Sequence, residues 1–152
     1  MRSGDYQLRD YVDERLVLFL DSATRDEALR TLVDHLHEVG KVTDTEAFYR
    51  AILGREQLVS TGIGMGVAIP HAKLPHFTDF FLAVGIHRRG VEWDALDGAP
   101  VRLIFLIGGP DDKQTRYLQL LSMLTAALRD PDRRRKLAHA TLASEVIQLL
   151  LT

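Results

Sequence analysis

One histidine stands beside a run of glycines spaced at alternate positions. His71 lies near the end of the segment TGIGMGVAIPHA, residues 61–72, which also contains Gly62, Gly64 and Gly66. Glycine allows positive φ and close approach of a ligand to the backbone, and successive N–H groups in such a loop can bind an anion. Imidazole is a nucleophile near neutral pH because its ordinary pKa is about 6.5. The segment therefore favours phosphoryl acceptance by His71.

Two neighbouring residues strengthen that interpretation. Pro70 fixes its own φ and stiffens the approach to His71, and Arg55 would add a fixed positive charge from the end of the preceding helix. Phosphoryl transfer depends mainly on such positioning and charge stabilisation. A purely structural glycine turn with a capping histidine stays open. A dinucleotide-binding fingerprint is excluded, because Val67 stands at the position of its third glycine. A P-loop is excluded as well, because its G-K-[ST] ending is absent.

The surrounding elements follow from apolar spacing. Helices are expected over about 24–39, 44–53, 113–128 and 142–150, the third with Leu118, Leu121, Leu124 and Leu128 as its apolar face. Strands are expected over 16–20, 67–69, 80–87 and 101–107, with a short edge strand at 91–93. The longer strands are almost continuously apolar, which indicates burial on both faces. The pattern predicts a layered α/β sandwich.

Composition narrows the class of protein further. The chain has 152 residues, no cysteine and a net charge of −2. We expect one domain over 1–152 with no attraction to nucleic acid or to anionic membranes. The N-terminus lacks the apolar core of a signal peptide, and no apolar stretch is long enough for a membrane-inserted helix. A cytoplasmic protein is the resulting expectation.

Other polar residues have alternative interpretations. His76 and His87 could complete a metal site with His71, but no metal-ligand spacing supports one, so neither a metal nor a cofactor is expected. Arg133–Lys136 is a basic run that could contact nucleic acid or an acidic protein. A solvated helix start balanced by nearby acids is the preferred interpretation.

The ordered residues 55–56, 59–64 and 66–71 (RE, VSTGIG and GVAIPH) resemble the signature of enzyme IIA proteins of the fructose/mannitol type. These proteins belong to the bacterial phosphoenolpyruvate-dependent phosphotransferase system. As a stand-alone domain, the chain most resembles the nitrogen-regulatory branch. The resemblance implies a mixed sheet flanked by helices. It also implies that His71 accepts a phosphoryl group from a histidine-containing phosphocarrier protein, with Arg55 at the site. The phosphoryl oxygens would be held by Thr61, Gly62, Gly64 and Gly66.

Tyr117 departs from this family pattern. Members usually carry a second histidine at the start of a late helix, where this chain reads Tyr117–Leu118–Gln119–Leu120–Leu121. A phenol can donate a hydrogen bond but supplies no positive charge at neutral pH. Two alternatives to the regulatory phosphocarrier therefore stay open: a weakly transferring or non-transferring regulatory module, and a sugar-specific protein that passes phosphate to enzyme IIB. Regulatory target proteins are further possible partners, and a homodimer also stays open.

Overall fold

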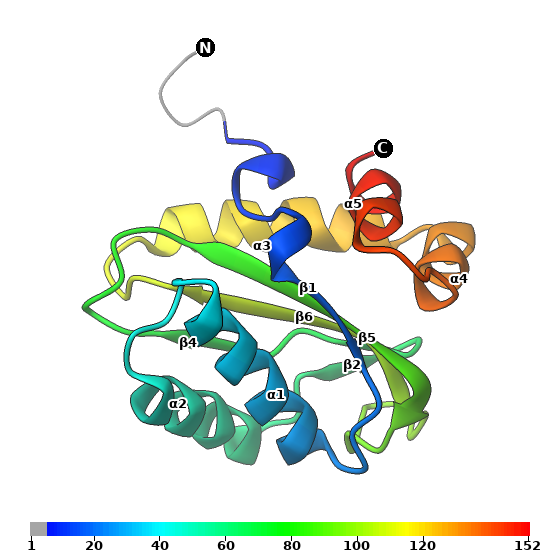
Figure 1. The fold of residues 1–152 in the computed structure, drawn as a ribbon, viewed down its shortest axis with the longest axis horizontal. Coiled ribbons are helices and arrows are strands. Elements are labelled where there is room, and N and C mark those ends of the chain that lie inside the picture. Colours follow the sequence, from blue (N-terminus) through cyan, green and yellow to red (C-terminus); the bar gives the residue numbers. More distant parts are fainter. Residues whose placement is uncertain (1–5) are drawn as a thin grey trace.

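The computed structural model describes residues 6–152, which form a six-stranded sheet between two helical layers (Figure 1). The 3₁₀ helices are η1 Leu8–Asp10 and η2 Glu14–Leu16. The strands are β1 Val17–Leu20, β2 Gly62–Gly64, β3 Val67–Ala68, β4 His71–Lys73, β5 Phe81–Val91 and β6 Val101–Gly109. The α-helices are α1 Arg25–Glu38, α2 Thr45–Leu58, α3 Gln114–Leu128, α4 Pro131–Ala138 and α5 Ala143–Leu151.

The sheet is mixed, and its central strand β6 determines where His71 lies. The strand order is β1-β5-β6-β3-β2, with β4 also paired to β6. β5 and β6 are antiparallel, whereas β1 pairs with β5 in parallel, and β3 and β4 both pair with β6 in parallel. β3 and β4 follow one another along β6, because Val67 lies opposite Leu103 and His71 opposite Ile107. This register holds His71 against the final residues of a buried strand.

Helices cover both faces of the sheet, as the sequence predicts. α1 and α2 lie on one side, and α3, α4 and α5 lie on the other (Figure 1). Thr24 and Asp44 cap α1 and α2 by accepting hydrogen bonds from backbone N–H groups of the first turn. The core between these layers is made of fully buried side chains, among them Leu29, Leu32, Phe48, Ile52, Leu82, Ile104, Phe105, Leu120, Leu124 and Val146.

The prediction for the apolar face of α3 is wrong in part. Leu124 and Leu128 are buried as expected, but Leu118 is 52% exposed, and Tyr117 and Leu120 lie in the core instead. Because this helix is apolar on more than one side, its sequence supports two adjacent stripes, and packing against the sheet selects one. This packing turns Tyr117 inward, so that it is 6% exposed.

Other boundaries also differ from the sequence expectations. The edge strand expected over 91–93 does not exist as a separate element: β5 runs on to Val91, which pairs with Val101. β2 and β4 are strands that the apolar pattern of the sequence does not predict. Each is three residues long, too short to show a hydrophobic alternation, and each forms only because a neighbouring strand accepts it.

The basic run Arg133–Lys136 lies in α4 and has structural partners. Arg133 donates to the carbonyls of Ala127, Leu149 and Thr152, and Arg134 donates to those of Leu128 and Arg129. These carbonyls belong to the C-terminal ends of α3 and α5, where positive charge is favourable. Lys136 pairs with Asp132, 3.2 Å away. This run therefore joins three helices.

Candidate functional site

His71 lies at the wall of a pocket of about 240 Å³ between α2, the β2–β3 segment and α3. The pocket brings together four of the residues predicted from the sequence: Arg55, Thr61, His71 and Tyr117. The other lining residues are Ser60, Ile63, Ile69, Leu121 and Thr125. The residues that line the pocket therefore come from segments up to 70 positions apart in the sequence, from Arg55 to Thr125.

The hydrogen bond made by the His71 ring determines which nitrogen can react. Nδ1 lies 3.2 Å from the carbonyl oxygen of Ile69. A carbonyl only accepts, so the neutral ring must carry its proton on Nδ1 and keep its lone pair on Nε2. Burial lowers the pKa of the His71 imidazole, and the charges of Arg55 and Lys73 lower it further, against the opposing hydrogen bond to Ile69 and the opposing charge of Glu56. The imidazole is therefore neutral and nucleophilic at neutral pH.

We expect this lowered pKa to be visible in the pH dependence of the protein. More than half of the molecules should keep a neutral His71 at pH 6.5, where half of an ordinary histidine is protonated. Because the unfolded chain binds that proton first as the pH falls, the free energy of unfolding should decrease from about pH 6.5 down to the folded-state pKa. Titration of the His71 ring by NMR measures its pKa in the folded protein directly. Lys73→Met should raise the pKa, and a wild-type pKa at or above 6.5 would contradict the assignment.

Arg55 and Lys73 supply the positive charge of the site. Arg55, half-buried near the end of α2, donates from Nη1 to the carbonyl of Val59, 2.8 Å away. Lys73 follows His71 by two residues on β4 and donates to Oε1 of Gln114 at 2.8 Å. Its Nζ also lies 3.9 Å from the centre of the Tyr117 ring. Arg55 lines the pocket and favours an anion there, whereas Lys73 is not among the lining residues and adds its charge from the face of the Tyr117 ring.

Tyr117 lies beside His71 on the first turn of α3. The centres of the two rings are 5.5 Å apart, and Tyr117 is buried. Burial raises the pKa of the Tyr117 phenol, so this side chain is neutral at physiological pH. It can donate one hydrogen bond within the pocket, and the neighbouring positive charge comes from Lys73 on its ring face.

The glycines of the 61–72 segment form a tight turn that packs against residues 93–97. Gly64 and Gly66 have φ values of 96° and 75°, and they flank Met65 in the turn between β2 and β3. A Cβ on Gly62 would lie 2.8 Å from the Cβ of Ala95. None of the three glycines is among the residues lining the pocket of His71. Their geometry thus has a packing explanation, and the expected role in holding phosphoryl oxygens stays a prediction.

Comparison with known proteins assigns the family. The model of the family described as phosphoenolpyruvate-dependent sugar phosphotransferase system, EIIA 2, matches residues 10–152. The chain belongs to this family. It is 34% identical over 133 residues, 88% of the chain, to the fructose-specific EIIABC component of Bacillus subtilis, of which it spans only 21%. It is 31% identical over 137 residues to a nitrogen regulatory protein of Bradyrhizobium diazoefficiens, covering 90% of the chain and 89% of that protein.

Solved structures support the same assignment. The crystal structure of IIA-Ntr from Neisseria meningitidis superposes with a TM-score of 0.85 at 26% identity, over 93% of this chain and 97% of that one. Mannitol IIA of Escherichia coli, solved in complex with phosphorylated enzyme IIB, gives a TM-score of 0.76 at 26% identity, over 91% and 96% of the two chains. This protein is thus an EIIA phosphocarrier domain, with relatives in both the nitrogen-regulatory and the sugar branch.

The EIIA domain also contains a buried polar network that the sequence did not reveal. The carboxylate of Glu56 accepts hydrogen bonds from the backbone N–H and the hydroxyl of Thr61 and from the indole N–H of Trp93. Both donors of Thr61 are therefore engaged by Glu56. Glu56 stands in the family motif next to Arg55, and that adjacency was the available signal. Trp93, which lies in the stretch 91–93 where the sequence predicts an edge strand, is 1% exposed.

His76 and His87 are placed apart from this chemistry. His87 is buried and its Nε2 lies 2.7 Å from the carbonyl oxygen of Ser22, while the ring of His76 packs on Phe77 with ring centres 4.4 Å apart. Within residues 6–152, no cluster of three or more histidine or acidic side chains could hold a metal ion. Over the same residues, no helix combines the length and the apolar character needed to cross a membrane.

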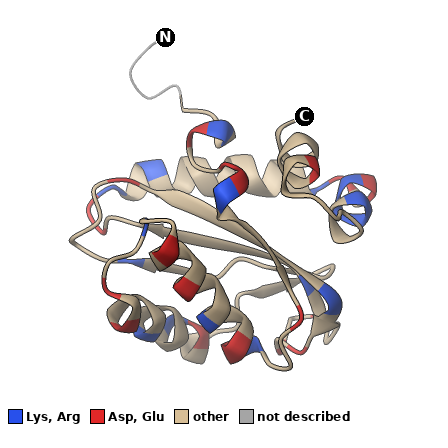
Figure 2. Ribbon diagram, in the orientation of Figure 1, with Lys and Arg blue, Asp and Glu red and all other residues tan. Residues whose placement is uncertain are grey.

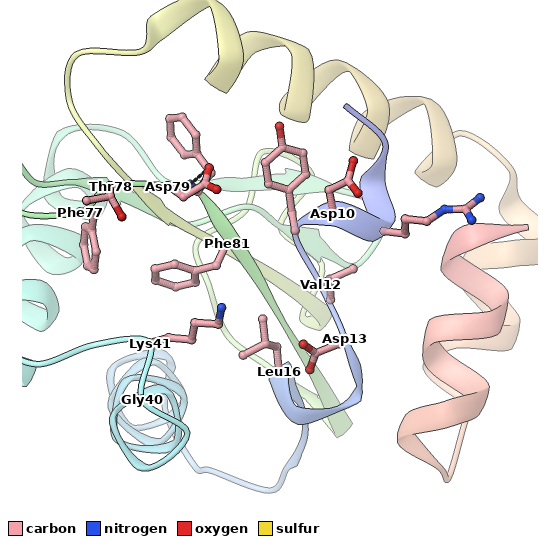
Figure 3. A pocket seen from close by; sticks show the side chains of 13 residues that line it. Asp10, Val12, Asp13, Leu16, Gly40, Lys41, Phe77, Thr78, Asp79 and Phe81 are labelled. Atoms are coloured by element: carbon pink, nitrogen blue, oxygen red, sulfur yellow. Dashed lines mark hydrogen bonds between the residues drawn. The ribbon is translucent and has the colours of Figure 1, made fainter. Parts of the chain in front are cut away.

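A second hollow, of about 270 Å³, lies where residues 9–16 meet the β4–β5 loop. Figure 3 shows it between Asp10 and Asp13 of the N-terminal segment, Lys41 after α1, and Phe77 and Phe81. The predicted site residues, Arg55, His71 and Tyr117 among them, do not line this second hollow. The pocket of His71 is therefore the site on which the functional argument rests.

Proposed function

We propose that this EIIA domain accepts a phosphoryl group on Nε2 of His71 from a cytoplasmic histidine-containing phosphocarrier protein. The observation that carries the proposal is the hydrogen bond from Nδ1–H to the Ile69 carbonyl, which leaves Nε2 with the free lone pair. Nε2 attacks the phosphorus of the donor's phosphohistidine. The donor P–N bond breaks, and its electron pair returns to the donor ring. Arg55 and Lys73 stabilise the charge on the transferring oxygens.

The surface around the pocket fits a partner that must bring its own histidine close. Val59, Ile63 and Leu118 are large apolar side chains exposed by 62%, 40% and 52%. The helix on this side, α3, carries Arg116 as its single charged residue and is uncharged along the rest of its length (Figure 2). An apolar surface with a positive pocket favours docking of a protein that carries a phosphoryl group.

A direct test is to locate the phosphate. The protein should become labelled when incubated with radioactive phosphoenolpyruvate and the two general proteins of the phosphotransferase system. The label should be acid-labile and base-stable, as phosphoramidates are, and mass spectrometry should find it on the peptide that contains His71. A label on another residue, or none at all, would overturn the proposal.

We assign the protein to the regulatory branch, in which the phosphorylation state controls partner proteins. The structural similarity is greater to IIA-Ntr, with a TM-score of 0.85, than to mannitol IIA, with 0.76. The alternative is a sugar-specific role, in which the phosphoryl group passes on to an enzyme IIB. The sequence identity to a fructose-specific relative supports this alternative. Transfer from the phosphorylated protein to purified enzyme IIB domains distinguishes the two, because a regulatory protein should retain its label.

Tyr117 favours a further candidate, a regulatory module that transfers slowly. If the missing imidazolium limits the rate, Tyr117→His should accelerate phosphorylation by about tenfold, because one charge-assisted hydrogen bond to the phosphoryl group is restored. Single-turnover phosphorylation of wild type and variant measures the ratio. Tyr117→Phe is the matched control, since it removes the hydroxyl without adding charge. Equal rates for wild type and Tyr117→His would count against slow chemistry at this site.

A further inference from the structure

A buried carboxylate lies next to the reactive pocket and has no part in the transfer step described above. Glu56, on the last turns of α2, is only 4% exposed. Its Oε2 accepts from the Thr61 N–H at 3.1 Å, and its Oε1 accepts from the Thr61 hydroxyl and, at 3.3 Å, from the Trp93 indole. An ionised carboxylate is a pure acceptor, so three donors match it well. Such a group is costly to bury unless it is fully hydrogen-bonded.

Hydrogen bonds lead from this carboxylate to the reactive ring. The carbonyl of Thr61 accepts from the N–H of Ile69 at 3.0 Å. The carbonyl of Ile69 accepts from Nδ1 of His71 at 3.2 Å. Each residue on the path therefore holds the next one in place, from Glu56 through Thr61 and Ile69 to His71. The path crosses between two strands whose own pairing is short, since β2 and β3 have three and two residues.

We propose that Glu56 is a positioning residue: by holding Thr61, it fixes the Ile69 carbonyl that keeps the His71 proton on Nδ1 and leaves Nε2 as the nucleophile. β6 holds this segment on one side, through the pairing of Ala68 and His71, whereas on the other side only the short β2–β3 pairing and Thr61 hold it. Glu56 strengthens this weaker side from the helix, where its backbone is rigid. The kinetic consequence of this inference rests on the proposed function, whereas the statement about the tautomer of His71 does not.

Glu56→Gln tests the proposal with little change in size. The amide can accept at one end only, so its NH₂ group faces donors that previously met a carboxylate oxygen. We expect Thr61 to shift, the Nδ1–H form of His71 to lose population, and the rate constant of phosphorylation to fall by about tenfold to hundredfold, as small misplacements of reacting groups do. The KM for the phosphorylated donor should stay within about twofold, because the exposed apolar side chains are unchanged.

Two readouts separate positioning from a general loss of structure. The ¹⁵N chemical shifts of the His71 ring report its tautomer in the unphosphorylated protein. The fluorescence of Trp93, the single tryptophan of the chain, reports whether its surroundings have changed. Glu46→Gln is the matched control: it makes the same chemical change on the same helix, at an exposed carboxylate that pairs with Arg30 at 2.8 Å. It should leave tautomer, fluorescence and rate as in wild type.

Trp93→Phe provides a milder second variant in case Glu56→Gln does not fold. It removes one donor from the carboxylate and should lower the rate constant by about threefold, again with an unchanged KM, since one of several hydrogen bonds is lost. The inference is overturned if folded Glu56→Gln retains the wild-type tautomer of His71 and a rate within twofold of wild type. If wild-type protein takes up no phosphate, the proposed function fails instead, and the ¹⁵N measurement still decides the role of Glu56.

Discussion

His71→Ala should reduce phosphorylation below detection, by at least about thousandfold, because the variant lacks the nucleophile itself. No other side chain that lines the pocket combines a free nitrogen lone pair with a pKa near neutrality, since Arg55 is permanently charged and Tyr117 is a neutral phenol. Labelling from phosphoenolpyruvate through the two general proteins measures the loss. His71→Gln should behave in the same way while preserving most of the side-chain volume.

The matched control is His76→Ala, which removes an exposed histidine five residues further on, in the loop between β4 and β5. It should be phosphorylated at the wild-type rate. Both variants should unfold at nearly the wild-type temperature, since His71 is only partly buried and contributes one hydrogen bond through its ring. Label on His71→Ala at more than a few per cent of the wild-type level would place the acceptor elsewhere.

Gly108→Ala should be strongly destabilising, by about 3 kcal/mol, which is the upper part of the range for overpacked cores. A Cβ at this position would lie 2.3 Å from Cζ of Phe81 and 2.9 Å from Cζ of Phe48. Both rings are buried and pack against each other with centres 5.9 Å apart, so neither can move away freely. Gly108 also pairs with Ala72, the residue after His71. Phosphorylation should therefore fall together with stability.

Gly54→Ala is the control for this second prediction. Gly54 lies within α2, and nothing stands within 4 Å of the Cβ that alanine would add. Alanine there should raise the free energy of unfolding by about 0.5–1 kcal/mol, because it restricts the unfolded chain and suits a helix. Thermal or urea denaturation of the two variants compares them directly. A Gly108→Ala protein as stable as wild type would show that the aromatic cluster can rearrange.

The sequence predicted the parts of this fold that are long and regular. α1 and α2 follow from caps and apolar spacing, and β5 and β6 from long apolar runs, so both faces of the sheet could be anticipated. The sequence also indicates the reactive segment, because histidine, proline and glycines stand close together in the chain. Arg55 came from the same local motif, and its place at the pocket follows from the end of α2.

What could not be predicted depends on contacts between distant segments. The inward rotation of Tyr117 is decided by packing, since α3 presents two apolar stripes. The packing of Gly62 against Ala95 is likewise a contact that local sequence does not encode. The network of Glu56, Thr61 and Trp93 joins residues up to 37 positions apart. Nothing in a lone tryptophan or a single buried glutamate indicates such a partner.

The position of β6 has a consequence for how the protein is made. β3, β4 and β5 all pair with it, although all three precede it in the chain. A nascent chain leaving the ribosome therefore holds the other five strands, and no central strand for them, until residue 109 has emerged. Such non-local pairing slows folding and leaves apolar segments exposed in the meantime. His71 is therefore synthesised before β6, but it takes up its position in the sheet only when β6 has formed and pairs with it.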